Sequence, residues 1–183
     1  MSILELKGVT KEYGQGHTLV QALKPTDFRL EAGQFVAIIG PSGSGKTTFL
    51  TLLGHLQTPS KGRILLHGKD TSQLKEKERV ALRFNDFGFI LQASNLIPFL
   101  KIEDQFQLID RLSKKERMDL DSLIELLDLK GTLKQYPKEL SGGERQRAAI
   151  ARALYNSPDI ILADEPTASL DTERAKRVVH LLK

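Results

Sequence analysis

The residues whose chemistry is clearest form a glycine-rich run near the start of the chain. The run fits the pattern G-x-x-x-x-G-K-[ST] in full, and its members are Gly40, Pro41, Ser42, Gly43, Ser44, Gly45, Lys46 and Thr47, followed by Thr48. Glycines permit a tight turn whose backbone N–H groups point inward around phosphate oxygens. A helix that begins near Gly45 would aim its positive dipole end at the same anion. A glycine-rich turn without a ligand is the alternative, and the predicted strand before the run and helix after it favour a nucleotide site.

Four side chains supply the expected chemistry of that site. Lys46 is expected to reach the β- and γ-phosphates, and the hydroxyl of Thr47 to bind Mg²⁺. Asp164 and Glu165 directly follow a second apolar run. A carboxylate at the end of a parallel strand beside a phosphate loop holds Mg²⁺ in P-loop enzymes, so we assign that role to Asp164. Glu165 is expected to orient or deprotonate the attacking water. Alternatively, both acids only cap the next segment.

A second predicted anion site opens a helix later in the chain. Ser141, Gly142, Gly143 and Glu144 place a hydroxyl and bare backbone N–H groups at that helix start. The motif is weak by itself, because an ordinary helix cap has the same residues. One chain with two phosphate-binding surfaces nevertheless suggests a head-to-tail dimer, in which Ser141 of each copy completes the site begun by Lys46 of the other.

Hydrophobic periodicity predicts the elements that must position these residues. Strands are expected at residues 3–9, 19–30, 34–39, 63–66, 87–91 and 160–163, and helices at residues 47–56, 102–129, 142–154 and 172 to the end. The runs 34–39 and 160–163 are continuously apolar, which is typical of strands buried on both faces. The alternation predicts an α/β fold with a parallel core sheet, an N-terminal antiparallel β subdomain and an inserted helical subdomain.

Composition limits the class of protein. The 183 residues are 40% hydrophobic and 27% charged, contain no cysteine and include no long apolar run, so we expect a globular chain without membrane spans or thiolate metal sites. The start lacks the layout of a secretory signal. A cytoplasmic location is compatible with the absence of cysteine. The net charge of +4 comes from scattered Lys and Arg, which favours a solvated surface over a nucleic-acid partner.

With these motifs in order, the whole chain resembles the nucleotide-binding domains of ABC transporters. The resemblance implies a P-loop NTPase fold in one domain over residues 1–183, with residues 92–157 as the helical subdomain. It identifies Gln92 with the Q-loop glutamine that contacts Mg²⁺ or water, and residues 169–171 with the D-loop at the dimer interface. Tyr13 resembles the aromatic residue that stacks on adenine; a lone surface tyrosine is the alternative.

The resemblance also implies a function and partners. It predicts an ATP- and Mg²⁺-dependent ATPase subunit at the cytoplasmic face of a bacterial membrane, which powers export or release through a permease. Residues 164–171 look most like the lipoprotein-release, macrolide-export and antimicrobial-peptide-export branch, whose permeases have four transmembrane helices. Residues 93–101 are similar to bacterial heme-exporter ATPases. The cargo itself is not encoded in a cassette that touches only ATP and the permease.

One part of the family pattern is missing. The family's switch histidine lies on a strand beyond the helix that follows the D-loop, and this sequence stops at Lys183. His180 comes too soon after Asp171 for a helix, a turn and a strand, so we expect it on a helix face. We therefore expect the switch-histidine portion to be absent, and hydrolysis to be weakened while ATP binding survives. A non-catalytic ATP-binding remnant and a cassette acting on ribosomes or DNA remain alternatives.

Overall fold

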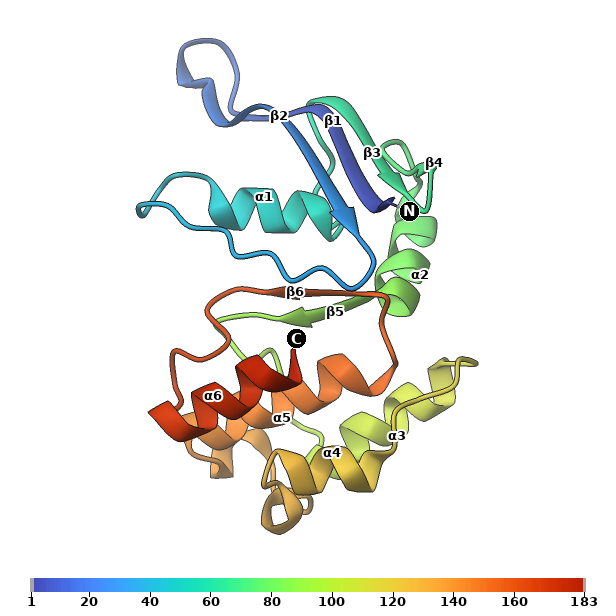
Figure 1. Cartoon of the computed structure of the whole chain (residues 1–183), viewed down its shortest axis with the longest axis vertical. Coiled ribbons are helices and arrows are strands. Elements are labelled where there is room, and N and C mark those ends of the chain that lie inside the picture. The colour runs from blue at the N-terminus through green and yellow to red at the C-terminus, as the bar shows by residue number, and fades with distance from the viewer. Residues whose placement is uncertain (1, 183) are drawn as a thin grey trace. The chain divides into compact units, whose positions relative to one another are not determined.

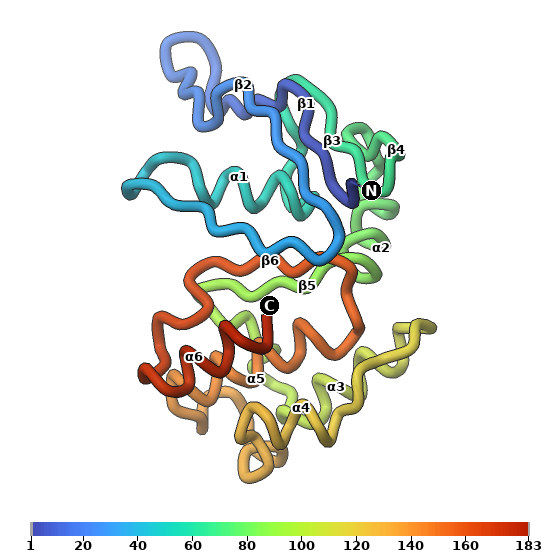
Figure 2. The backbone as a smooth tube through the Cα atoms, viewed as in Figure 1, coloured from blue at the N-terminus to red at the C-terminus, as the bar shows by residue number. Residues whose placement is uncertain are grey.

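The computed structural model describes residues 2–182, which divide into two compact units at residues 81 and 82. Figures 1 and 2 trace the elements of each unit along the chain. The boundary falls within α2 (Glu76–Asp86), a helix with no buried residue. The sequence analysis missed this helix, because a segment that buries no side chain gives no apolar periodicity to detect.

The first unit is built on an antiparallel sheet. Its strands lie in the order β2-β1-β3-β4, with a short 3-10 helix, η1 (Gly16–Thr18), in the turn between the first two. The strands are β1 (Ser2–Tyr13), β2 (Val20–Glu31), β3 (Lys61–Leu66) and β4 (Lys69–Asp70). The antiparallel pairing of β1 and β2 confirms the expected hairpin.

Helix α1 (Lys46–Leu53) packs on one face of this sheet. Along β1, Leu4 and Leu6 are buried, as are Ile64 of β3 and Leu52 of α1. Alternate residues of a strand point to the same face, so Leu4 and Leu6 lie on one face of the sheet. The ring of Phe49 meets that of Phe28 on β2 edge to face, 5.3 Å between centroids.

The segment 34–39, predicted as a buried strand, is neither a strand nor buried. It is irregular, and Phe35 and Ile39 are 54% and 93% exposed. The strand pairings found within residues 2–182 do not include it. Continuous apolarity shows that a segment gains by burial, but a strand also needs a neighbour to pair its backbone groups. The sequence pattern does not specify that neighbour, which is why the prediction was wrong here.

The second unit combines a short parallel sheet with helices. β5 (Phe87–Ile90) pairs with β6 (Ile160–Ala163) in parallel register, so Ile90 lies opposite Ala163. The helices are α3 (Ile102–Leu112), α4 (Leu120–Leu126), α5 (Gly142–Tyr155) and α6 (Thr172–Leu181), with 3-10 turns η2 (Lys130–Thr132) and η3 (Pro137–Glu139). The helix expected over 102–129 is thus two helices. His180 lies on α6, as expected.

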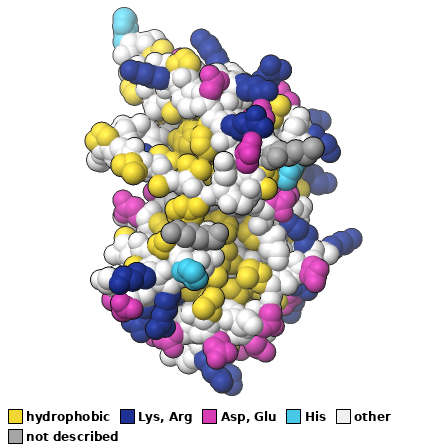
Figure 3. All heavy atoms as spheres, in the orientation of Figure 1, with side chains coloured by type: hydrophobic (Ala, Val, Ile, Leu, Met, Phe, Trp, Pro, Cys, Tyr) yellow, Lys and Arg dark blue, Asp and Glu magenta, His cyan; other side chains and the backbone are white. Residues whose placement is uncertain are grey.

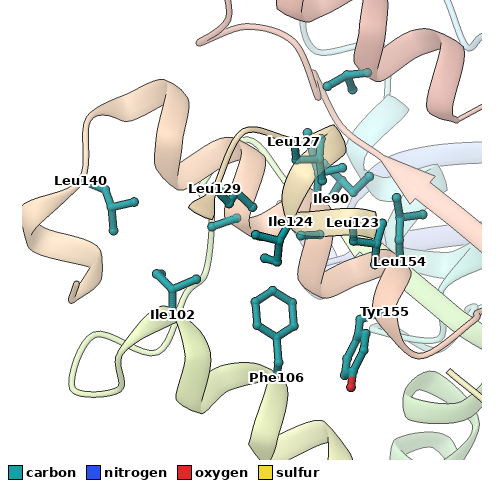
Figure 4. Close-up of a cluster of buried hydrophobic side chains, with 14 residues drawn as sticks. Ile90, Ile102, Phe106, Leu123, Ile124, Leu127, Leu129, Leu140, Leu154 and Tyr155 are labelled. Atoms are coloured by element: carbon teal, nitrogen blue, oxygen red, sulfur yellow. The ribbon is translucent and has the colours of Figure 1, made fainter. Parts of the chain in front are cut away.

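A hydrophobic core joins the helices of this unit to β5 (Figure 4). Phe106 of α3 is 1% exposed, and its ring meets that of Tyr155 edge to face at 5.4 Å. The Tyr155 hydroxyl reaches the edge of the core and donates to Asp110 Oδ1 at 2.8 Å. Ile90 of β5 and Ile150 of α5 are fully buried in the same cluster. The core therefore holds β5 and α5 in place. Candidate site residues follow the C-terminal end of β5 and lie at the N-terminal end of α5.

The surface carries mixed charge. On the face drawn in Figure 3, basic and acidic side chains are interspersed with hydrophobic ones. None of the helices in the described part of the chain is long and apolar enough to cross a membrane.

Candidate functional site

The glycine-rich run leads into α1 through two left-handed residues. Gly43 and Gly45 have φ of +77° and +90°, a region that L side chains rarely adopt. A Cβ at Gly45 would lie 2.6 Å from the Ala22 carbonyl oxygen on β2. Gly45 is also the N-terminal cap of α1. Glycine is therefore required here both for the turn and for its close approach to the sheet.

The lysine of this loop is turned onto the loop itself. Lys46 Nζ donates to the carbonyl oxygens of Gly40 and Pro41, at 2.8 Å each. The ammonium thus lies in the loop at the N-terminus of α1, where the backbone N–H groups and the helix dipole favour an anion. Gly40, Pro41 and Lys46 therefore lie together in one loop.

Tyr13 lies at the end of β1 with one ring face occupied. Its hydroxyl donates to the side-chain oxygen of Gln57, and Lys11 Nζ lies 5.2 Å from the ring centroid. The side chain is 40% exposed. A cation over one face of a tyrosine ring is attracted by the ring's quadrupole and fixes the ring's orientation. Tyr13 is therefore a held, partly exposed aromatic side chain in the same unit as the glycine-rich loop.

The acidic strand end lies beside Gln92 in the second unit. Asp164 N donates to Ile90 O at 2.8 Å, which extends the β5–β6 ladder by one bond. Glu165 then leaves the strand with a left-handed φ of 49°. This turn brings its Oε2 to 3.3 Å from Gln92 Nε2. Two residues predicted to act at one reaction centre thus meet at the carboxyl ends of neighbouring parallel strands.

Ser141 and Glu144 form a reciprocal cap at the start of α5. Ser141 Oγ accepts from Glu144 N at 3.3 Å, while Glu144 Oε2 accepts from Ser141 N and Oγ at 2.8 and 2.7 Å. The hydroxyl and backbone hydrogen bonds from Ser141 lower the pKa of Glu144 below its usual value. The helix-cap interpretation of the motif is thus correct, and the same turn presents Gly142 and Gly143 at a helix N-terminus.

The segment that resembles a D-loop, residues 169–171, packs directly against this turn. A Cβ at Gly143 would lie 3.3 Å from the Ser169 carbonyl oxygen and 3.7 Å from the Leu170 side chain. Gln146, on the first turns of α5 and 4% exposed, donates to Pro166 O at 3.2 Å. The sequence analysis missed Gln146, because nothing in its spacing distinguishes it from other polar residues of the helix. It ties α5 to the segment after Glu165.

The chain has a tight glycine-rich loop before a helix, an acidic strand end and a helix-rich second unit. These features define the class of P-loop nucleotide hydrolases. The chain matches the ABC transporter family over residues 23–168. Hemin import ATP-binding protein HrtA of Staphylococcus haemolyticus is 44% identical over 98% of this chain and 83% of its own length. The uncharacterized ABC transporter ATP-binding protein MJ1508 of Methanocaldococcus jannaschii is 43% identical over 99% of this chain and 83% of its own length.

Two solved structures of an ABC transporter cassette are similar to this chain. The dimeric bacterial ABC transporter cassette MJ0796 is 36% identical with a TM-score of 0.90, covering 98% of this chain and 81% of that one. Its post-hydrolysis dimer, bound to ADP and phosphate, has a TM-score of 0.89 with the same coverage. The chain belongs to the ABC transporter family, as the ATP-binding cassette of a membrane transporter. Membership confirms the expected fold class and the expected activity, ATP hydrolysis by a dimerising subunit that works with a membrane permease.

Proposed function

We propose that this cassette hydrolyses ATP at composite sites in a head-to-tail dimer, with Glu165 as the catalytic base. The observation that carries the proposal is the 3.3 Å contact between Gln92 and Glu165. A general base must be held where it can take a proton from the attacking water. Gln92 supports that geometry from the segment that follows β5, and it supplies an amide that can bind the same water.

The nucleotide would be held by the glycine-rich loop. Backbone N–H groups of Gly40 and residues 42–45 would surround the phosphates, together with those of Thr47 and Thr48 at the start of α1. Pro41 has no N–H and would contribute only the shape of the turn. Lys46 then exchanges its bonds to Gly40 O and Pro41 O for the β- and γ-phosphate oxygens. Tyr13 stacks on adenine with the ring face opposite Lys11.

The residues assigned to Mg²⁺ offer a donor set that suits it. Asp164 supplies a carboxylate, Gln92 an amide oxygen and Thr47 a hydroxyl, and hard oxygen donors of this kind are the ligands that Mg²⁺ prefers. The amide nitrogen of Gln92 is already turned to Glu165, which leaves its oxygen as the donor. When bound, Mg²⁺ would neutralise charge on the phosphates.

A second copy of the chain would complete each site. The turn at Ser141, Gly142, Gly143 and Glu144 presents a helix N-terminus that favours the γ-phosphate of ATP held by the other copy. A lone cassette would then bind ATP but hydrolyse it slowly. We also propose that residues 1–183 act as one ATPase domain with residues 92–157 as the helical subdomain, and that no nucleic acid takes part.

The proposed partner is a permease with four transmembrane helices, which would hold the cassette at the cytoplasmic face of a bacterial membrane. The cargo class we propose is haem. The HrtA relatives are named for hemin import, and residues 93–101 resemble heme-exporter ATPases. In cells that lack the gene for this cassette, accumulation of haem would indicate export and deficiency of haem would indicate import. Unchanged haem content and haem tolerance would contradict this cargo.

The first test is Mg²⁺-dependent ATP turnover by the chain over a range of protein concentrations, with Lys46→Ala as the blank. Turnover that rises more than linearly with concentration is expected, because two copies make each site. Turnover strictly proportional to concentration, at concentrations where the chain is a monomer, would contradict the composite site. ATP binding without turnover at any concentration would identify the chain as a binding remnant.

A further inference from the structure

The N-terminal cap of α6 ties Arg174 to the D-loop. Asp171 Oδ1 accepts from Arg174 N at 2.9 Å, and Asp171 Oδ2 accepts from Arg174 Nη1 at 2.8 Å. These bonds from Arg174 lower the pKa of Asp171, so the carboxylate is charged at neutral pH. One arm of the guanidinium is therefore fixed to the last residue of the D-loop.

The other arm of that guanidinium reaches a different element. Arg174 Nη2 lies 3.5 Å from Asp128 Oδ2, just beyond the C-terminal end of α4. The same carboxylate oxygen lies 3.8 Å from Nη2 of Arg147, on α5. Asp128 has a left-handed φ of 53°, so the chain turns sharply where the carboxylate is shared by the two arginines.

Arg147 carries the network to the signature turn, residues 141–144. Its side chain is buried, with Nε donating to Leu127 O at 2.8 Å and Nη2 to Asp128 O at 3.4 Å. A Cβ at Gly143 would lie 3.6 Å from Arg147 Nη1 and 3.3 Å from Ser169 O. The signature turn therefore packs on both the arginine and the D-loop.

We propose that Arg174 is a positioning residue that holds the D-loop against the signature turn through Asp128 and Arg147. The side chains of Asp171, Arg174, Asp128 and Arg147 alternate in charge. The Asp128 carboxylate is attracted by both arginines, and the Asp171 carboxylate is attracted by Arg174. The Arg174 and Asp128 side chains are 46% and 72% exposed, and pairs so exposed add little to global stability. The expected effect is therefore local: the two segments keep one mutual arrangement. Its consequence for the dimer rests on the proposed function.

The direct test is amide hydrogen exchange of the full chain, which needs no dimer. Arg174→Ala should speed exchange at residues 141–145 and 167–171 by about twofold to fivefold, the range that exposed ion pairs give. Lys176→Ala is the matched control, because the ion pair of Lys176 with Glu173 stays within α6. Arg174→Lys should rescue only part of the effect, since an ammonium lacks the two arms of a guanidinium. A change confined to α6, or equal in the control, would overturn the proposal.

Asp128→Asn tests the shared carboxylate. The change removes the charge, and asparagine tolerates the left-handed backbone. If Arg174 acts through Asp128, the effects of Arg174→Ala and Asp128→Asn on exchange at residues 141–145 should be less than additive in the double variant, which retains neither ion pair of Asp128. Fully additive effects would show that the two residues act independently, against the proposal.

A second measurement separates positioning from the proposed function. In a Glu165→Gln background, Arg174→Ala should raise the Kd of the ATP-dependent dimer by about twofold to fivefold, while ATP binding by the monomer stays unchanged. An unchanged dimer Kd would overturn the link from positioning to assembly. A Glu165→Gln parent that stays monomeric with ATP would contradict the composite-site function, and hydrogen exchange would still decide the role of Arg174.

Discussion

Gln92 and Glu165 are 73 residues apart in the sequence, yet Gln92 Nε2 lies 3.3 Å from Glu165 Oε2. The contact exists because β5 and β6 run in parallel with Ile90 opposite Ala163, so both strands deliver their following residues to one edge. The left-handed backbone of Glu165 then turns its carboxylate toward the neighbouring strand. The ABC cassette thus joins its expected base to its expected Q-loop glutamine within one unit.

Replacement of Glu165 by Gln should remove turnover but not ATP binding. An amide cannot accept a proton from water, and loss of a general base typically lowers rates by about 100-fold to 10,000-fold. Phosphate release and equilibrium ATP binding measure the two properties. Glu173→Gln, on an α6 side chain that is 77% exposed, is the control. Undiminished turnover would show that Glu165 is not the base.

The Tyr13 side chain should contribute to ATP affinity through its ring. Stacking of a base on an aromatic side chain is worth about 1–3 kcal/mol, so Tyr13→Ala should weaken ATP binding by roughly fivefold to a hundredfold. Tyr13→Phe loses only the hydrogen bond to Gln57 and should bind nearly normally. Inorganic tripolyphosphate, which lacks adenine, should bind all three proteins equally. If Tyr13→Ala weakens both ligands alike, the ring does not stack on the base.

Gly45→Ala should destabilise the first unit more than Gly68→Ala. Both glycines have left-handed φ, +90° and +76°, but only a Cβ at Gly45 meets a backbone atom, Ala22 O at 2.6 Å. The left-handed backbone alone costs about 1–2 kcal/mol with a side chain. Denaturant unfolding of both variants isolates the additional cost of the clash. Equal losses of stability would mean that the loop can move away from β2.

The signature turn should lose stability in acid through Glu144. Hydrogen bonds from Ser141 lower its pKa below the usual 4.5, so the folded state binds this proton less tightly than the unfolded state. The stabilisation is therefore complete above pH 4.5 and is lost as pH falls through the lowered folded-state pKa. Glu144→Gln should flatten the acid limb of an unfolding free-energy profile. Glu125→Gln, an exposed residue of α4, should leave that limb unchanged.

Truncation of Phe106 should destabilise the helical core. The side chain is 1% exposed and packs on Tyr155, so Phe106→Ala should cost about 3–5 kcal/mol. Phe99→Ala makes the same chemical change at a residue that is 75% exposed and should cost little. The difference in denaturant midpoint measures burial. A small effect at Phe106 would indicate that the core collapses readily around the missing ring.

The sequence by itself determined the features that depend on local chemistry. The glycine-rich run, the Ser141 cap and the β1–β2 hairpin follow from residue type and short spacing, because turn conformation, helix capping and strand alternation are set by neighbours in the chain. The same signals identified the nucleotide hydrolase class and its family. They also predicted the residue at which α5 begins, Gly142.

Only the tertiary structure decided the relationships between distant segments. Apolar residues 34–39 were predicted as a strand, but strand pairing depends on which neighbour supplies hydrogen bonds, and none of the pairings within residues 2–182 includes them. The break between α3 and α4 is similar, since one periodicity fits one long helix or two short ones. The contact of Arg174 with Asp128 has no signal in either local sequence. Such contacts arise because packing brings remote side chains within reach, and spacing along the chain does not record that distance.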